Sequence, residues 1–269
     1  MKNLYILKLG GSVVTHKDEQ DLKIRKELLQ NIALNLKKII EDTEVKLVII
    51  HGAGSYGHRL AKKYNLQDIQ SQTDINWQGV LETKLSVQKL NTEIAEIFLN
   101  TGVHVLPIHP SSIVIQDNSN IDEVYLETIK KALENNLVPL LYGDMTFDKA
   151  KGISICSGDK LVPYLSEKLG AKKIIYATDV AGIFNKDPHL NKDVKLIKNI
   201  LIDNGKIELI SGLEGSHSED VTDGLRGKIK ELNNLKKTQE IIIFNGLKIE
   251  NYLKVFNGFE FDCTKIKRA

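Results

Sequence analysis

The chain has 269 residues, of which 42% are hydrophobic and 27% charged, and its formal net charge is +2. This composition is typical of a globular protein and leaves room for one large domain or two coupled lobes. The balanced charge disfavours a protein that coats nucleic acid, and the longest apolar runs are too short to span a membrane. We therefore expect no nucleic-acid or membrane partner. Cys156 and Cys263 are too few for a disulfide framework or a four-ligand zinc site, so we expect reduced thiols in a cytoplasmic protein without a signal peptide.

Short apolar runs alternate with helical patterns along the chain. Runs rich in Ile, Leu and Val predict strands at Leu4–Leu9, Lys46–Ile50, His104–Ile108, Val138–Tyr142, Lys173–Ala177 and Glu240–Phe244. Apolar residues at helical spacing predict helices at Ile24–Glu41, Leu81–Leu99, Val124–Asn135, Lys160–Leu169 and Leu225–Lys236. A polar DKAKG segment between two short runs predicts a β-hairpin across Met145–Ile155. Because continuous apolar runs suit strands buried on both faces, this alternation predicts a parallel sheet covered by helices.

Three glycine-rich turns follow predicted strands or apolar stretches. They are KLGGS at Lys8–Ser12, HGAGSYGH at His51–His58 and ISGLEG at Ile210–Gly215, the last in a polar stretch that ends in TDGLRGK at Thr222–Lys228. Ligands of open α/β sheets bind beyond the carboxyl ends of the strands. Glycines there let backbone N–H groups approach phosphate oxygens, and a following helix N-terminus adds a favourable dipole. Strand-to-helix turns also favour glycine for purely structural reasons, but three such turns, each near a Lys or His, indicate a phosphate site.

Two common nucleotide-binding patterns do not fit. The spacing of Gly52, Gly54 and Gly57 matches the dinucleotide fingerprint GxGxxG. A dinucleotide-binding unit needs a second strand that ends in an acidic residue about 20 residues later, and here that window reads QDIQSQTDINW. The chain also has no GxxxxGK[ST], which disfavours a P-loop nucleotidase.

At these motifs the chain resembles the amino-acid kinase superfamily, and within it the isopentenyl phosphate kinases. The segments that carry the resemblance include LKLGGSVVTHK, VIIHGAGSYGH, LVPLLYGD, ISICSGDKLVPYLSEKLGA, IIYATDVAGIF and DVTDGLRGKI. The resemblance implies an αβα sandwich on a mostly parallel central sheet of about eight strands. It also implies a single amino-acid kinase domain with two lobes, in which residues 1–170 bind the acceptor and residues 171–269 bind ATP.

The resemblance assigns roles to individual residues. Lys8, Lys17, His58 and Asp159 would be the catalytic group, with Lys17 at the transferring phosphoryl group and Asp159 orienting the lysines. The acceptor would be held by Ala53, Gly54, His58 and Gly158. ATP would be held by Lys8, Gly10, Gly11, Ser12, Gly54, Asp179, Gly182, Gly224 and Lys228. Ala53 stands where the family commonly has glycine, and Lys160 stands where it often has a second acid.

The chemistry of the acceptor agrees with these assignments. A phosphate monoester is mostly dianionic at neutral pH, so its oxygen is already a nucleophile and needs no general base. The difficulty is repulsion between the acceptor and the ATP tail, which lysines and Mg²⁺ can neutralise. We expect Mg²⁺ to be held mainly by the ATP phosphates, with no protein metal site, and we expect a homodimer as in the family.

The function expected from the resemblance is the ATP-dependent phosphorylation of isopentenyl phosphate to its diphosphate, a step in making isoprenoid precursors. Two alternatives remain open: a kinase for another small phosphate or phosphonate acceptor, of the fosfomycin or uridylate type, and a nucleotide sensor without turnover. Some residues also have structural interpretations. Asp159 could simply cap the helix that follows it, His51 is expected to be structural, and Cys156 is expected to be a small apolar residue.

Overall fold

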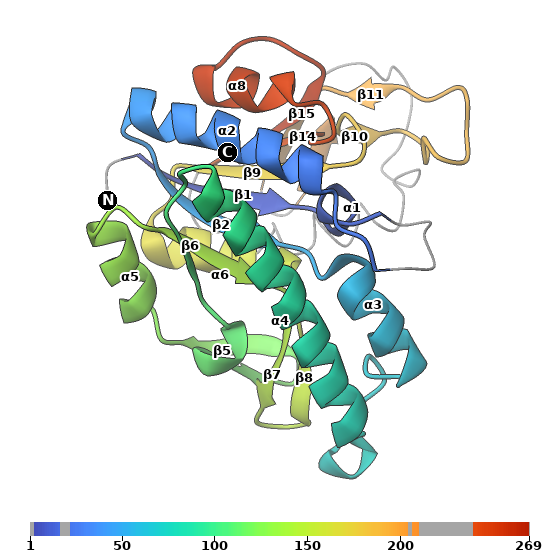
Figure 1. The fold of residues 1–269 in the computed structure, drawn as a ribbon. Coiled ribbons are helices and arrows are strands. Elements are labelled where there is room, and N and C mark those ends of the chain that lie inside the picture. The colour runs from blue at the N-terminus through green and yellow to red at the C-terminus, as the bar shows by residue number, and fades with distance from the viewer. Residues whose placement is uncertain (1–2, 17–21, 204–205, 210–238, 269) are drawn as a thin grey trace.

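The computed structural model describes residues 3–16, 22–203, 206–209 and 239–268 (Figure 1). The strands are β1 (Leu4–Leu9), β2 (Lys46–His51), β3 (Val105–Pro107), β4 (Val114–Asp117), β5 (Asn120–Val124), β6 (Val138–Tyr142), β7 (Asp144–Asp148), β8 (Gly152–Cys156), β9 (Lys173–Thr178), β10 (Ile183–Phe184), β11 (Leu196–Ile197), β12 (Asn199–Asp203), β13 (Lys206–Leu209), β14 (Glu240–Asn245) and β15 (Cys263–Arg268). The helices are α1 (Gly11–Val14), α2 (Lys26–Thr43), α3 (Gly54–Lys63), α4 (Trp77–Asn100), α5 (Glu127–Glu134), α6 (Gly158–Leu169) and α8 (Glu250–Asn257).

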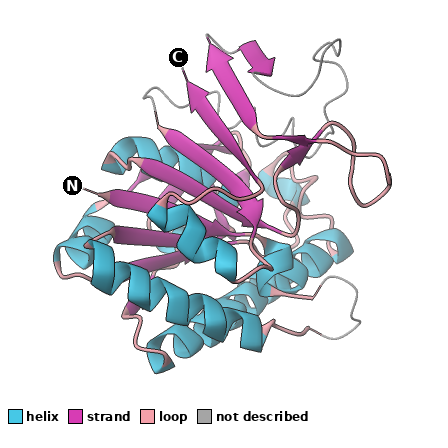
Figure 2. Cartoon of the chain, turned by 90° about the horizontal axis from the view of Figure 1, so that it is seen from above, coloured by secondary structure: helices cyan, strands magenta, loops and turns pink. Residues whose placement is uncertain are grey.

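Nine of the described strands form the central sheet, in the order β13-β12-β15-β14-β9-β1-β2-β6-β3. From β14 to β3 every neighbouring pair is parallel, whereas β15 pairs with β14 and β13 pairs with β12 in the antiparallel sense. Figure 2 shows these strands side by side in one twisted sheet. The carboxyl ends of the parallel strands therefore meet at one edge, where a ligand is expected to bind.

Helices cover both faces of the sheet and bury two separate cores. On one face, β1 places Leu7 and Leu9 against a core to which α2, α4 and α8 contribute. On the other face, Leu4 and Ile6 of β1 pack with apolar residues of α5 and α6. Side chains alternate along a strand, so Lys8 belongs to the face of Leu4 and Ile6 and points toward α6. Figure 1 shows α2 and α4 in front of the sheet and α6 behind it, which confirms the αβα sandwich.

A smaller four-stranded sheet has the order β5-β4-β7-β8. Its β7 and β8 form the hairpin predicted across Met145–Ile155, with the register Asp144↔Cys156 to Asp148↔Gly152. Met145 and Ile153 of this hairpin share a third apolar cluster with Val80 of α4. The hairpin is thereby fixed beside the N-terminal half of α4.

Most of the expected elements are present, with shifted boundaries. The strand at Leu4–Leu9 is as predicted, and the helix predicted at Leu81–Leu99 begins four residues earlier, at Trp77. The helix predicted from Val124 is wrong at its start, because Val124 ends β5 and the helix begins at Glu127. Leu81 and Leu85, two of the apolar residues at helical spacing in this segment, are 53% and 67% exposed. The helix predicted at Leu225–Lys236 lies outside the described residues.

None of the helices in the described ranges is long and apolar enough to cross a membrane.

Candidate active site

Two glycine turns meet at the carboxyl ends of β1 and β2. A Cβ on Gly52 would lie 2.6 Å from the backbone nitrogen of Gly11, and a Cβ on Gly11 would lie 2.9 Å from Cα of Gly54. Gly54 also has a φ of +52°, a conformation that favours glycine. The two backbones can approach this closely only because neither turn has side chains between them. The result is a surface of backbone groups of the kind that cradles phosphate.

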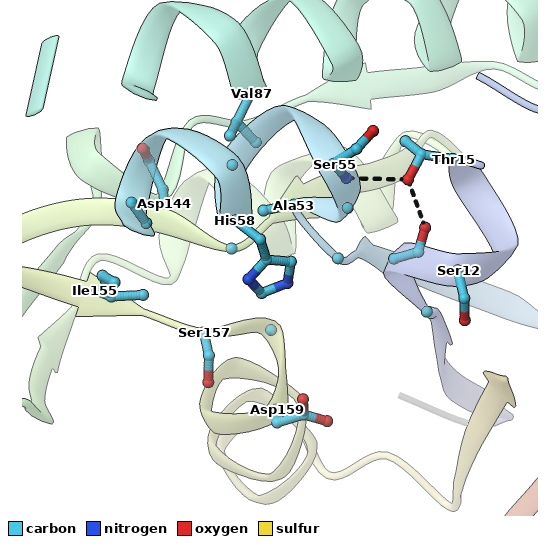
Figure 3. Close-up of a pocket in the computed structure, with 18 of the residues that line it drawn as sticks. Ser12, Thr15, Ala53, Ser55, His58, Val87, Asp144, Ile155, Ser157 and Asp159 are labelled. Atoms are coloured by element: carbon cyan, nitrogen blue, oxygen red, sulfur yellow. Dashed lines mark hydrogen bonds between the residues drawn. The ribbon is translucent and has the colours of Figure 1, made fainter. Parts of the chain in front are cut away.

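The hydroxyl of Thr15 links the two turns. Its Oγ1 donates a hydrogen bond to the carbonyl oxygen of Gly11 at 2.9 Å and accepts one from the backbone nitrogen of Ser55 at 3.1 Å. Figure 3 shows both bonds, which join the start of α1 to the start of α3. Thr15 and Ser55 both line the cavity described below. This contact has no local sequence signal, because the two residues are 40 positions apart.

The first turn of α6 faces the same edge from the other side of the sheet. Asp159 forms an ion pair with Lys8, whose residue as a whole is 8% exposed. A Cβ on Gly158 would lie 3.4 Å from Cε of Lys8, so the start of α6 packs directly on this lysine. Ser157 caps α6, because its side chain accepts from the backbone nitrogen of Lys160 at 3.3 Å. Asp159 is therefore not the N-cap, and its carboxylate is committed to Lys8 instead.

His58 points from α3 into the space between α3 and α6. Figure 3 shows its imidazole directed toward Ser157 and Asp159 at the start of α6. The surrounding protein lowers the pKa of His58, chiefly through desolvation and then through the positive charge of Lys8, while Asp159 opposes the shift. At neutral pH the ring is mostly neutral, so it donates one hydrogen bond and can gain a proton when an anion arrives.

These groups line one cavity of about 510 Å³. Toward Ser12 and Asp159 its walls are polar, with the two glycine turns, Lys8 and the first turn of α6. Beyond His58 the cavity continues toward Ile155 and Asp144, as Figure 3 shows. The apolar residues that line the cavity are Ala53, at the glycine turn, and Ala61, Val87, Met145 and Ile155. The cavity thus combines a polar part, walled by the glycine turns, with an apolar part, and His58 lies between them.

Most of the predicted site residues come together in this cavity. The predicted residues that line it are Lys8, Gly10, Gly11, Ser12, Ala53, Gly54, His58, Gly158, Asp159 and Asp179. Gly182 is not among the lining residues; a Cβ there would lie 2.4 Å from Oγ1 of Thr264, so it packs against the start of β15. Lys17, Gly224 and Lys228 lie outside the described residues.

A charged pair that was not predicted from the sequence lies in the wall of the apolar part. Nζ of Lys84, on α4, lies 3.2 Å from Oδ1 of Asp144 and 3.2 Å from the carbonyl oxygen of Met145. The Asp144 side chain is 1% exposed and also accepts from the backbone nitrogens of Ser111 and Met145. The pair joins α4 to β7 and so holds the two sides of the apolar part together. The only sequence signal was Asp144 after a predicted strand, and its partner is 60 residues away.

Phosphate groups fit this site better than a metal ion bound by protein side chains. The cradle of the two glycine turns is a space that a single Cβ would fill. No group of three or more His, Cys, Asp or Glu side chains suited to a metal ion occurs in the described part of the chain. The carboxylate of Asp159 is paired with Lys8. A metal ion would therefore fit here together with the phosphates of a nucleotide.

The fold and the site define a small-molecule phosphotransferase of known architecture: the chain belongs to the amino acid kinase family, whose model matches residues 3–245. Several of its relatives within that family are isopentenyl phosphate kinases. The chain is 32% identical to the one from Methanothermobacter thermautotrophicus and 34% identical to the one from Methanocaldococcus jannaschii, with 98% of each chain covered in both comparisons. A crystal structure of an isopentenyl phosphate kinase matches with a TM-score of 0.83 at 30% identity, covering 98% of this chain and 99% of that one.

Proposed function

We propose that the protein is an isopentenyl phosphate kinase, which transfers the γ-phosphoryl group of ATP to isopentenyl phosphate and releases isopentenyl diphosphate and ADP. The observation that carries the proposal is the single cavity in which a glycine phosphate cradle and His58 adjoin an apolar pocket. The full-length similarity to isopentenyl phosphate kinases supports the same assignment.

The acceptor uses both parts of the cavity. Its phosphate accepts hydrogen bonds from the backbone of Ala53, Gly54 and Gly158 and from the imidazole of His58. A dianionic phosphate has three terminal oxygens, so a side-chain donor beyond the backbone N–H groups is useful. The isopentenyl tail lies against the apolar side chains, where burial of its carbon atoms contributes about 0.8 kcal/mol per CH₂ group.

ATP occupies the other end of the site. Lys8 and the turn of Gly10, Gly11 and Ser12 contact its phosphates, and Asp179 lies beside the nucleotide. The full set proposed for ATP also contains Lys17, Gly54, Gly182, Gly224 and Lys228. In this assignment residues 1–170 form the acceptor-binding lobe, which also contributes Lys8 and the first glycine turn to the ATP phosphates, and residues 171–269 form the ATP-binding lobe. Mg²⁺, when bound to the ATP phosphates, neutralises part of their charge.

Transfer requires positioning and neutralisation of charge, because the acceptor phosphate is already a nucleophile. Lys8 is buried beside Asp159, which holds its ammonium group at the edge of the sheet. A fixed positive charge in a largely water-excluded site stabilises the charge that develops on the transferring group. Lys17 and Lys228 add further positive charge at the phosphates. We also propose that the enzyme is a cytoplasmic homodimer, as expected for the family.

The acceptor is tested with a panel of monophosphates and Mg²⁺-ATP, with ADP release as the signal. We expect the highest kcat/KM for isopentenyl phosphate, with uridine monophosphate and fosfomycin as matched controls of the alternative acceptor types. A higher kcat/KM for either control than for isopentenyl phosphate would mean that the natural acceptor is of that control's type. A protein that binds ATP but releases no ADP with any acceptor would instead be a nucleotide sensor.

A further inference from the structure

A buried histidine lies directly behind the glycine turn of the acceptor site. His51 is the last residue of β2 and is 0% exposed. Its Nδ1 lies 2.9 Å from the carbonyl oxygen of Gly52, and its Nε2 lies 3.1 Å from Nδ2 of Asn91 on α4. The ring also stacks on Tyr142 at a centroid distance of 5.5 Å. His51 does not line the cavity, and the mechanism above does not use it.

These contacts determine the protonation of the ring. A carbonyl oxygen only accepts hydrogen bonds, so Nδ1 must carry the proton and donate it to Gly52. Nε2 is then the acceptor, and the amide nitrogen of Asn91 donates to it. Burial lowers the pKa of His51 to about 4, so the ring stays neutral at physiological pH.

The orientation of the Asn91 side-chain amide supports this tautomer of His51. Its Oδ1 is buried and has no hydrogen-bond partner among the described residues. Turning the amide over would place Oδ1 against Nε2, which has no proton to donate in this tautomer. An unsatisfied buried oxygen is unfavourable, so the contact with His51 is the stronger requirement at this position.

The hydrogen bond from His51 to the Gly52 carbonyl oxygen also fixes the direction of the next backbone donor, the N–H of Ala53. The Gly52 carbonyl and the Ala53 N–H belong to one peptide unit, and in a trans peptide these two groups point in opposite directions. The described chain contains no cis peptide bond. Because His51 holds the carbonyl toward the protein interior, the N–H of Ala53 is turned the other way. Gly52 and Ala53 both line the cavity, so that direction leads into the acceptor site.

We propose that His51, held in one tautomer by Asn91, is a positioning residue that aims the Ala53 N–H at the acceptor phosphate. The proposal rests on the acceptor site assigned above. The two histidines of the HGAGSYGH motif then have different roles. His58 contacts the phosphate, whereas His51 acts through the backbone.

Two substitutions separate this role from a purely structural one. In His51→Asn, the side-chain amide nitrogen can take the place of Nδ1 and still donate to Gly52. In His51→Gln, the amide reaches the place of Nε2 instead and leaves the Gly52 carbonyl without its donor. Both variants should be less stable than the wild type, His51→Asn because of the larger cavity and His51→Gln because of the unsatisfied carbonyl oxygen. A positioning role predicts that only His51→Gln also loses acceptor binding.

The test measures KM for isopentenyl phosphate and for ATP, the calorimetric Kd for isopentenyl phosphate, and the thermal midpoint of each variant. We expect His51→Gln to raise the acceptor KM and Kd about tenfold, the effect of weakening one hydrogen bond to a charged group, with the ATP KM unchanged. His51→Asn should stay within a few-fold of the wild type despite its lower midpoint. Tyr142→Phe is the control, since it disturbs the same buried cluster and removes only the hydroxyl contact with His109; it should leave both KM values unchanged.

The tautomer is measured independently by ¹⁵N NMR of histidine-labelled protein, with the His51 signals assigned by their loss in His51→Asn. We expect a protonated Nδ1 and an unprotonated Nε2 throughout the neutral pH range. A protonated Nε2, or equal acceptor KM values in His51→Gln and His51→Asn with an active wild type, would overturn the positioning role alone. If the wild type neither binds nor phosphorylates isopentenyl phosphate, the proposed function fails and the positioning role falls with it.

Discussion

Lys8 and Asp159 form an ion pair across the carboxyl edge of the sheet, although 150 residues separate them in the chain. Lys8 comes from β1, and Asp159 comes from the first turn of α6, where a glycine at 158 lets the helix pack against the lysine. The pair brings a positive charge to the point where the two glycine turns meet. The side chain of Asp159 is 34% exposed on the cavity side, so the pair borders the space that the reacting phosphates would occupy.

Replacing Lys8 tests whether this charge acts on the reaction. Lys8→Met keeps most of the length of the side chain and removes its charge. We expect kcat to fall by about 100- to 1,000-fold, as when one donor to a developing anion is removed, while KM changes less. Circular dichroism and the thermal midpoint check that the variant is folded. A folded variant with nearly normal kcat would remove Lys8 from the catalytic group.

His58 should take up a proton when the acceptor binds. Its pKa is lowered in the free protein, so it is mostly neutral at neutral pH, and an incoming phosphate dianion favours the charged imidazolium. Calorimetry near pH 6.5 in buffers of different ionisation enthalpy should therefore report net proton uptake with isopentenyl phosphate. His58→Gln keeps a donor but cannot be charged, so its proton uptake should be lost and part of its activity kept. Uptake that is equal in wild type and His58→Gln would assign the proton to another group.

The apolar part of the cavity should set the size of the acceptor. Val87 is buried and lines the cavity from α4. Val87→Phe fills space there and should lower kcat/KM for isopentenyl phosphate about tenfold or more, because overpacking costs about 1–3 kcal/mol. The KM for ATP is the internal control and should not change. If kcat/KM for isopentenyl phosphate were unaffected, the tail would have to lie elsewhere.

The ion pair between Lys84 and Asp144 should be important for stability. Asp144→Ala leaves the Lys84 ammonium group without its partner and removes the acceptor of two backbone N–H groups. Breaking a buried pair in this way costs about 3–5 kcal/mol. Urea unfolding measures the loss, and Glu127→Ala, which breaks the exposed pair with Lys130, is the control that should leave the midpoint nearly unchanged. Equal midpoints for the two variants would contradict the account.

The lowered pKa of His51 predicts that the protein becomes less stable as the pH falls. Its pKa is about 4 in the folded protein, against 6.5 for an unperturbed histidine, so the unfolded chain binds the proton more readily. This contribution to stability is complete above about pH 6.5 and is lost as the pH falls toward about 4, by about 3 kcal/mol in total. The free energy of unfolding should therefore fall more steeply in the wild type than in His51→Asn between these values. Parallel pH profiles would show that His51 does not have this pKa.

The sequence predicted those parts of the fold that have a local signal. Continuous apolar runs gave β1, β2, β6, β9 and β14, because strands buried on both faces need apolar residues at every position. The last strand, β15, was missed because its sequence CTKIKR alternates polar and apolar residues after a run of loop residues. Helix α3 was also missed, since it begins inside the glycine motif at Gly54 and continues as the polar stretch GHRLAKK.

The site was predicted only where its residues belong to a contiguous motif. Lys8 and His58 were assigned through the resemblance, on motifs in which they adjoin glycine turns at strand ends. The bond from the Ser55 backbone to Thr15 and the pair of Lys84 with Asp144 could not be predicted, since their partners come together only when the sheet and α4 are assembled. Gly182 also has a structural reason to be glycine. The resemblance assigned it to the nucleotide, and a Cβ there would lie 2.4 Å from Oγ1 of Thr264 in β15.

The acceptor assignment is tested most directly by ³¹P NMR of the complete reaction, with wild-type protein, Mg²⁺, ATP and isopentenyl phosphate. We expect the single resonance of isopentenyl phosphate to be replaced by the two coupled resonances of a diphosphate ester, with one ADP formed for each diphosphate. An isopentenyl phosphate resonance that persists while ATP is stable, or while ATP is hydrolysed to ADP and free phosphate, would contradict it.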